Sequence, residues 1–139
     1  MSQYAARGDR VLEAVAEQGI AALLVTDPAN VRYLTGYVGS NGIAVISPRG
    51  RRLITDGRYA VSARTEVEAA EVVIGERDLM EAVAAAVGEL AEGGPVGVEA
   101  EHVTLARGAR LERREHEARV DPPRTHDADR AKRRRRLHS

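Results

Sequence analysis

The stretch over residues 19–42 constrains the fold of this chain more than any other part of its sequence. It opens with an apolar run, residues 20–25, whose length and β-branched content are typical of a buried strand. Pro28 ends that strand, because it has no backbone N–H to donate to a sheet. Its fixed φ suits the first turn of a helix that either Thr26 or Asp27 caps.

Polar side chains follow this strand at the point where it ends. We expect a helical turn over residues 29–34 that Gly36 closes, and then a tight turn through residues 39–42. The polar side chains in the helical turn are Asn30, Arg32 and Tyr33. Open α/β sheets commonly bind ligands at the carboxyl ends of their strands, so these residues are site candidates.

Periodicity and turn residues predict the remaining elements. Helices are expected over residues 5–18, 59–67, 79–90 and 105–111, and strands over residues 43–46, 52–55, 71–74 and 96–99. The connection over residues 47–50 contains Pro and Gly, which indicates a β-hairpin. Helices that alternate with strands around one hairpin predict an α/β fold with a mixed sheet.

Composition limits the chemistry that is available to the chain. It has no Phe and no Trp, so its core is built from Val, Leu, Ile and Ala. It has no Cys, which excludes disulfides, thiolate metal sites and cysteine nucleophiles. The amino terminus lacks the pattern of a signal peptide, and no apolar run reaches the roughly 18 residues of a membrane span. We therefore expect a cytoplasmic protein without membrane contact.

The last part of the chain differs in character from the rest. Residues 1–111 carry a net charge of −4, whereas residues 112–139 carry +4 and contain only Val120 and Leu137 as large aliphatic residues. Such a segment buries too little apolar surface to offset the entropy of ordering. We expect a domain over residues 1–111 and a charged tail over residues 112–139 that is disordered or a frayed helix.

Two motifs carry a family resemblance. NVRYLTGYVGSNG at residues 30–42 and LITDGRY at residues 53–59 are similar, in order and spacing, to the amino-terminal domain of the creatinase, prolidase and X-Pro aminopeptidase family. The resemblance extends from about Arg10 to about Leu111. It implies a mixed β-sheet flanked by helices, related to the ribonuclease H-like topology, which agrees with the α/β fold predicted from periodicity.

The resemblance also implies a role. In that family this domain is non-catalytic: it supports oligomer contacts and shapes the substrate entrance, sometimes that of a partner subunit. Hydrolysis of the bond before a proline takes place in a second, pita-bread domain, where two Asp, one His and two Glu hold a pair of divalent ions (Mn, Co or Zn). No matching ligand motif is found in this chain, so we expect no catalysis and no cofactor here. Creatinase shares the amino-terminal domain but hydrolyses a non-peptide substrate without metal, so the substrate stays open.

The implied partners are a further copy of the chain or a catalytic domain, and, for the full-length family, a proline-containing peptide. The arginine-rich tail lacks family character and stands where a linker and the catalytic domain would follow. The sequence therefore suggests a truncated or frame-disrupted gene product.

Two triplets of polar residues are the site candidates, and they admit two interpretations. The triplets are Asn30, Arg32 and Tyr33, and Asp56, Arg58 and Tyr59. In the functional interpretation they line a substrate entrance or a subunit interface, where the planar fork of an arginine binds carboxylates. In the structural interpretation, which we favour, Asp56 accepts backbone hydrogen bonds, either Arg32 or Arg58 pairs with it, and the tyrosines pack. We expect Asn30 and Asn41 to satisfy turns.

An alternative function rests on the tail. Residues 132–136 form a basic run that suits nucleic acid or another acidic partner, which would make the chain a stand-alone binding module. The tail has no aromatic residue to stack on bases, and acidic residues precede the run, so nucleic acid is the less favoured partner. His126, Asp127 and Asp129 have the spacing of metal ligands, but they lie in the same tail and we expect no metal there. His102 and His116 are isolated and are expected at the surface.

Overall fold

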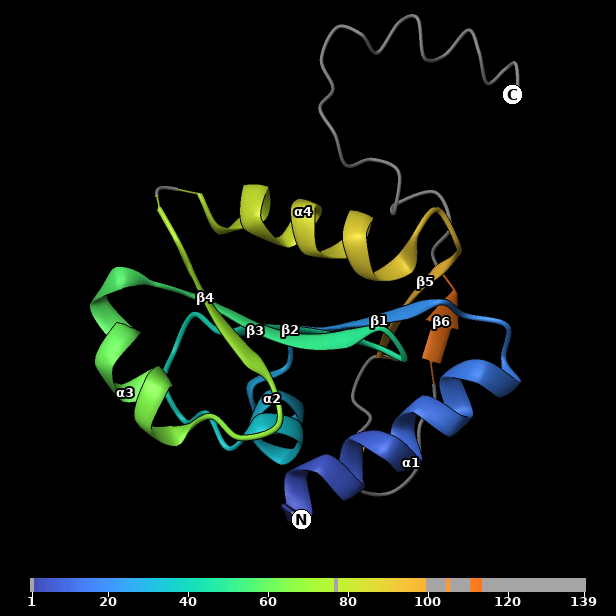
Figure 1. Ribbon diagram of the computed structural model, residues 1–139, viewed down its shortest axis with the longest axis horizontal. Coiled ribbons are helices and arrows are strands. Elements are labelled where there is room, and N and C mark those ends of the chain that lie inside the picture. Colours follow the sequence, from blue (N-terminus) through green and yellow to red (C-terminus); the bar gives the residue numbers. More distant parts are fainter. Residues whose placement is uncertain (1, 77, 100–104, 106–110, 114–139) are drawn as a thin grey trace, which may run out of the picture.

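The computed structural model describes residues 2–76, 78–99, 105 and 111–113, which form a six-stranded sheet with helices on both faces (Figure 1). The strands lie in the order β4-β3-β2-β1-β5-β6. They are β1 (Ala22–Val25), β2 (Ile43–Ser47), β3 (Gly50–Asp56), β4 (Glu71–Gly75), β5 (Val96–Glu99) and β6 (Leu111–Arg113). The helices are α1 (Gln3–Glu17), α2 (Pro28–Thr35), α3 (Ala60–Glu66) and α4 (Leu79–Ala91), with a 3₁₀ turn η1 (Gly57–Tyr59) before α3.

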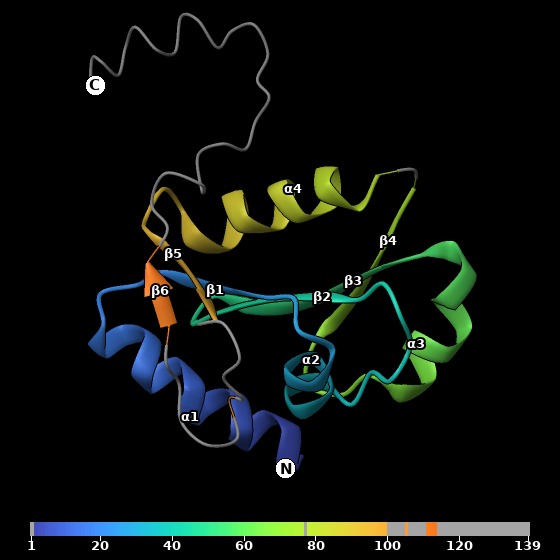
Figure 2. The ribbon, with the colours of Figure 1, turned by 180° about the vertical axis from the view of Figure 1, so that it is seen from behind.

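Each face of the sheet has its own apolar core. Helix α4 covers one face, and α1, α2 and α3 lie on the other, as the two opposite views in Figures 1 and 2 show. Because side chains alternate along a strand, Leu53 enters the core beneath α1 and α2, whereas its neighbour Ile54 enters the core beneath α4. The α/β fold with a mixed sheet flanked by helices is therefore confirmed.

Strand directions bring both sequence motifs to one edge of the sheet. The pairs β1–β5 and β3–β4 are parallel, whereas β1–β2, β2–β3 and β5–β6 are antiparallel. Strands β1, β3, β4 and β5 therefore end at the same edge, and β2 begins there. The turn after β1 carries the first motif and the turn after β3 carries the second.

The local signals in the sequence act as predicted. Of the two candidate caps of α2, Asp27 is the one that accepts a hydrogen bond, from the Ala29 N–H at 2.9 Å, and Pro28 is the first helical residue. Gly36 ends α2 with φ +84°, a left-handed conformation that glycine adopts without strain. Asp78 caps α4 by accepting from the Met80 N–H at 3.0 Å.

Several predicted boundaries were wrong by a few residues; helix α1, for example, begins at Gln3 and not at residue 5. Strand β1 begins at Ala22 and not at residue 20. The Ile20 N–H donates to the Val15 carbonyl at 3.0 Å, so this residue takes part in the turn that closes α1 and not in the sheet. The hairpin turn has two residues, not four, because β2 pairs with β3 as far as Ser47 opposite Gly50.

The carboxyl-terminal part differs most from the expectation. Leu111 was predicted to end a helix, but it begins β6 and lies opposite Glu99 of β5, and β6 includes two residues that we assigned to the tail. Residues 106–110 and 114–139 lie outside the described residues, and with them the rest of that helix, the basic run and the His126 group; His102 lies outside them too. In the part of the chain that the structure describes, no helix has the length and apolar character to span a membrane.

The two-core arrangement predicts unequal effects of one chemical change. Val15 of α1 is 0% exposed and Val61 of α3 is 80% exposed. Val15→Ala should lower the free energy of unfolding by about 2 kcal/mol through lost burial and the cavity left behind. Val61→Ala should change it by less than about 0.5 kcal/mol. Urea unfolding followed by circular dichroism measures both, and equal effects would contradict the assigned position of α1.

Candidate functional site

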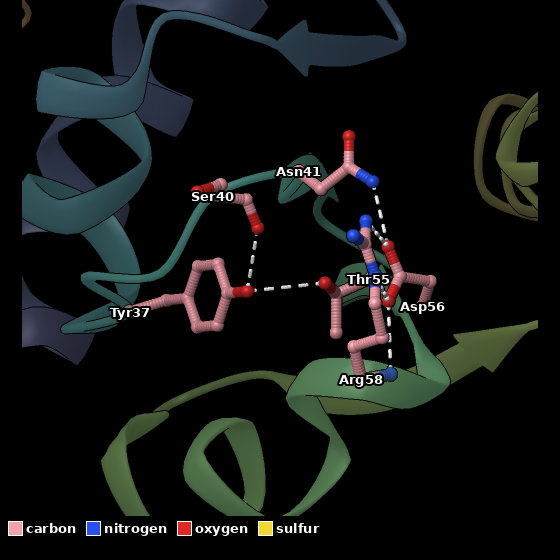
Figure 3. A network of polar contacts seen from close by, with 6 residues as sticks. All are labelled: Tyr37, Ser40, Asn41, Thr55, Asp56 and Arg58. Carbon is pink, nitrogen blue, oxygen red and sulfur yellow. Dashed lines mark hydrogen bonds and ion pairs between the residues drawn. The ribbon is translucent and has the colours of Figure 1, made fainter.

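The carboxylate of Asp56, the last residue of β3, organises a cluster of side chains at the sheet edge (Figure 3). Its Oδ1 accepts from the Arg58 backbone N–H at 2.9 Å and from Arg58 Nε at 3.1 Å. Its Oδ2 accepts from Arg58 Nη2 at 3.0 Å and from Asn41 Nδ2 at 2.6 Å. The Arg58 guanidinium lies 5.3 Å from the centroid of the Tyr59 ring. The second predicted triplet is therefore brought together, and Asn41 joins it.

These donors change the protonation equilibrium of the pair. The Arg58 side chain first, and the Asn41 amide second, hold the pKa of the Asp56 carboxyl far below its ordinary value of 3.8. The same pairing raises the pKa of Arg58. The cluster therefore keeps one negative and one positive charge at any physiological pH.

The ring of Tyr37 fixes the loop that carries Asn41, which we name the Tyr37 loop (residues 36–42). Tyr37 is 1% exposed, and its hydroxyl donates to the Ser40 carbonyl at 2.7 Å and shares a hydrogen bond with Thr55 Oγ1 at 3.1 Å (Figure 3). Burial raises the pKa of this hydroxyl, so it stays protonated and remains a donor. A Cβ added at Gly42 would overlap the ring, and one at Gly39 would come within 2.5 Å of the hydroxyl oxygen. The loop is therefore wrapped closely around the ring.

A pocket of about 230 Å³ lies beside the Tyr37 loop. Its lining residues come from the end of β1, the start of α2, the loop and the start of β2: Thr26, Pro28, Val31, Gly39, Asn41, Gly42 and Ile43. Asn41 belongs both to this pocket and to the Asp56 cluster. The pocket is mostly apolar, with one hydroxyl and one amide as its polar side-chain groups.

Asn30 lies in a different network. It is buried in α2, where its Nδ2 donates to Glu99 Oε2 at 3.0 Å and its Oδ1 accepts from the Leu105 N–H at 2.8 Å. Glu99, at the end of β5, also accepts from the backbone N–H of Thr26 at 2.8 Å and of Asp27 at 3.3 Å. Asn30 therefore links α2 to Glu99 of β5 and to Leu105.

The other two residues of the first triplet also point to separate neighbours. Tyr33 contacts α1: Arg10 Nη2 donates to its hydroxyl at 3.1 Å, and the Arg7 guanidinium lies 4.6 Å from its ring centroid. Arg32 is exposed, and within the described residues it has no ion pair. The six candidates therefore do not form one constellation.

Sequence reasoning missed the two residues that hold the loop in place. Tyr37 and Thr55 lie within the two motifs, but neither was named as a candidate, because a single Tyr or Thr shows no catalytic or ligand-binding pattern by itself. The signal that could have found Tyr37 is the pair of glycines, Gly39 and Gly42, that follow it closely and leave room for its ring.

The described residues were also tested as metal ligands. Among residues 2–76, 78–99, 105 and 111–113, no group of three or more His, Cys, Asp or Glu side chains is placed to hold an ion. This part of the chain does not fit the divalent metal pair that the family resemblance implies for a catalytic domain.

Comparison with known proteins identifies the family. Residues 7–130 match the family described as Creatinase/Prolidase N-terminal domain. The chain is 36% identical to the N-terminal domain of the cytoplasmic peptidase PepQ from Mycobacterium tuberculosis, covering 73% of this chain and 78% of that one, with a TM-score of 0.61. It is 29% identical to the Xaa-Pro dipeptidase from Bacillus anthracis, covering 74% of this chain and 29% of that one, with a TM-score of 0.65.

A curated relative matches over a shorter stretch. Over 55 residues the chain is 46% identical to YqhT from Bacillus subtilis (strain 168), which is described as an uncharacterized peptidase. That match spans 40% of this chain and 16% of the relative. The chain belongs to the creatinase/prolidase amino-terminal domain family.

Close wrapping of the Tyr37 loop predicts that its glycines resist substitution. Gly42→Ala should lower the free energy of unfolding by about 1–3 kcal/mol, because the added methyl group overlaps the buried Tyr37 ring. Gly57→Ala is the matched control, because a Cβ there has no heavy atom within 4 Å. Urea titration of both variants measures the difference, and a neutral Gly42→Ala would contradict the loop geometry.

The low pKa of Asp56 predicts a pH dependence of stability. A carboxyl whose pKa is depressed in the folded state contributes stability that is fully present above its ordinary value of 3.8. That contribution is lost as the pH falls toward the lower pKa of the folded state. Thermal unfolding between pH 6 and pH 2.5 should therefore show a steeper loss in the wild type than in Asp56→Asn, with Asn41→Ala in between. Identical slopes in all three proteins would refute the pairing.

Proposed function

We propose that this chain acts as the non-catalytic amino-terminal domain of an X-Pro metallopeptidase-like protein, where it contributes oligomer contacts and shapes substrate access. The chain belongs to a family of amino-terminal domains, which supports its placement at the amino-terminal end of a longer protein. The chain covers 29% of the Bacillus anthracis dipeptidase. The remaining length of such a protein supports the presence of a second domain that would carry out the hydrolysis.

The observation that carries the proposal is the fixed Tyr37 loop beside the pocket. Hydrogen bonds hold the loop to β3 through Tyr37 and Asn41, and to α3 through the Val38 N–H, which donates to Glu66 Oε1 at 3.1 Å. The loop nevertheless exposes an apolar side chain, because Val38 is 59% exposed. A loop that is rigid and yet presents apolar surface suits contact with a neighbouring domain or a bound peptide.

Arg58 supplies a charge at the same edge. Its side chain is 72% exposed although it binds Asp56, so its guanidinium is accessible to a further carboxylate. An arginine held in place by a carboxylate is pre-oriented, which favours binding of a peptide carboxylate at a small entropic cost. We assign to Arg58 the role of guiding a peptide carboxylate toward the entrance.

Metal, substrate and location follow from the same proposal. In such a protein a catalytic domain would hold the divalent pair (Mn, Co or Zn) and act on a proline-containing peptide. A cytoplasmic location is proposed because the relative from Mycobacterium tuberculosis is described as a cytoplasmic peptidase.

A domain exchange tests the proposed role. Residues 2–113 would replace the corresponding segment of the Bacillus anthracis Xaa-Pro dipeptidase, and kcat and KM would be measured on an X-Pro dipeptide. We expect an active chimera in which Asn41→Ala raises KM several-fold with a smaller change in kcat, because the variant frees the loop at the entrance.

Glu13→Ala, an exposed change on α1, is the control for that experiment. It should leave both constants unchanged. A chimera whose KM responds equally to the two substitutions, or to neither, would contradict the proposed role in substrate access.

A further inference from the structure

Strand β4 is an outermost strand of the sheet, and the edge that it forms runs along the strand rather than across the strand ends. It is the first strand in the order β4-β3-β2-β1-β5-β6 and pairs with β3 alone, from Arg52 opposite Glu71 to Asp56 opposite Gly75. Figure 1 shows β4 in front of the rest of the sheet, with no other described element in front of it. One row of its backbone N–H and C=O groups therefore has no strand beside it within the described residues.

The residues of β4 do not protect this edge. Natural edge strands commonly carry a lysine, a proline or a bulge that prevents pairing with another chain. Strand β4, with the sequence EVVIG, has none of these, and its pairing with β3 runs without interruption. Its one charged residue, Glu71, is already paired with Arg52 of the same chain at 3.6 Å. Val72, Val73 and Ile74 are half-buried in the isolated chain. The edge is therefore open and apolar.

We propose that β4 pairs antiparallel with β4 of a second copy of this chain, about a two-fold axis at Val73, so that the two sheets become one. Such an isologous contact requires that the strand be complementary to itself. A register centred on Val73 pairs all five residues of the strand, with Val72 opposite Ile74 and Glu71 opposite Gly75. Within the strand it sets no carboxylate opposite another carboxylate, because Glu71 is the acidic residue of β4 and faces Gly75.

Neighbouring registers are less favourable. A register that places Val73 opposite Ile74 is excluded by symmetry, because directly opposed residues share a face of the sheet whereas these two neighbours point to opposite faces. Axes centred on Val72 or on Ile74 keep the two-fold symmetry but pair only three residues within the strand, residues 71–73 or 73–75. The register centred on Val73 therefore pairs the greatest length of the strand.

The side chains of β4 match across the same axis. Val72 packs against the core beneath α1 and α2, and Val73 packs against the core beneath α4. Directly opposed residues of an antiparallel pair share a face of the sheet, so Val72 of one copy would contact Ile74 of the other on the first face. On the second face, Val73 would contact its own symmetry mate. Both cores would continue across the junction.

This inference rests on the oligomer contacts of the proposed function and names the surface that makes them. Strand addition is a known mode of association in which backbone hydrogen bonds give affinity and alternate side chains give specificity. A five-residue pair is small beside the roughly 800 Å² per partner of a typical stable interface. We therefore expect a dimer whose population rises with protein concentration.

Cysteine cross-linking of the full 139-residue chain tests the register. The chain has no native cysteine, so a disulfide in Val73→Cys can form only at the introduced position. Opposed Cα atoms in an antiparallel pair lie about 4.5–5.5 Å apart, within the range of about 4.4–6.8 Å that a disulfide requires. Val61→Cys is the matched control, because Val61 is more exposed but lies on α3.

The proposal predicts that Val73→Cys forms a covalent dimer at least tenfold faster than Val61→Cys under mild oxidation, on a non-reducing gel. Sedimentation equilibrium of the wild type should show a concentration-dependent monomer–dimer equilibrium. Equal cross-linking rates at the two positions, or a wild type that stays monomeric at millimolar concentration, would overturn the proposal.

A charge-exchange experiment tests the axis independently. Val73→Glu and Val73→Lys should each be monomeric, because the axis sets like charges against each other, whereas an equimolar mixture should form a heterodimer. Circular dichroism checks that each variant is folded. If Val73→Glu or Val73→Lys is unfolded, the cross-linking rate of Val73→Cys tests the proposal instead. A monomeric result leaves the chimera activity of the preceding section intact, so the two proposals fail separately.

Discussion

The candidate site depends on the buried ring of Tyr37. Because its hydroxyl bonds to Ser40 within its own loop and to Thr55 of β3, the ring sets the distance between the loop and the sheet. Asn41 then reaches Asp56, and Asp56 orients Arg58. A tyrosine can do this because its apolar ring packs in the core while its hydroxyl forms hydrogen bonds in defined directions. The cluster at the sheet edge is thus a consequence of one packed side chain.

Much of the fold could be predicted from the sequence, because its signals are local. Asp27, Pro28 and Gly36 set the bounds of α2 through capping and fixed dihedral angles, and these effects involve neighbours along the chain. Asp56 was expected to pair with Arg32 or Arg58, and Arg58, two positions away along the chain, is its partner. The two motifs also carried the family resemblance, which the family match then confirmed.

The remainder depends on contacts between distant parts of the chain. Asn30 was expected to satisfy a turn, but its side chain binds Glu99 and the Leu105 N–H, partners about seventy residues away that no local pattern indicates. Strand β6 was missed because the short segment Leu111–Arg113 has no strand pattern of its own and is defined by pairing with β5. Five of the six candidate residues therefore belong to three separate networks, and Arg32 forms no ion pair within the described residues.

The central claim is that this domain supports a reaction without performing it, and the most direct test is an assay of the purified chain. The 139-residue protein would be incubated with X-Pro dipeptides and tripeptides in the presence of Mn²⁺, Co²⁺ or Zn²⁺, and the release of proline would be measured. The account predicts a rate no higher than that of the metal ion alone. Turnover that survives repurification and disappears on addition of a chelator would contradict it.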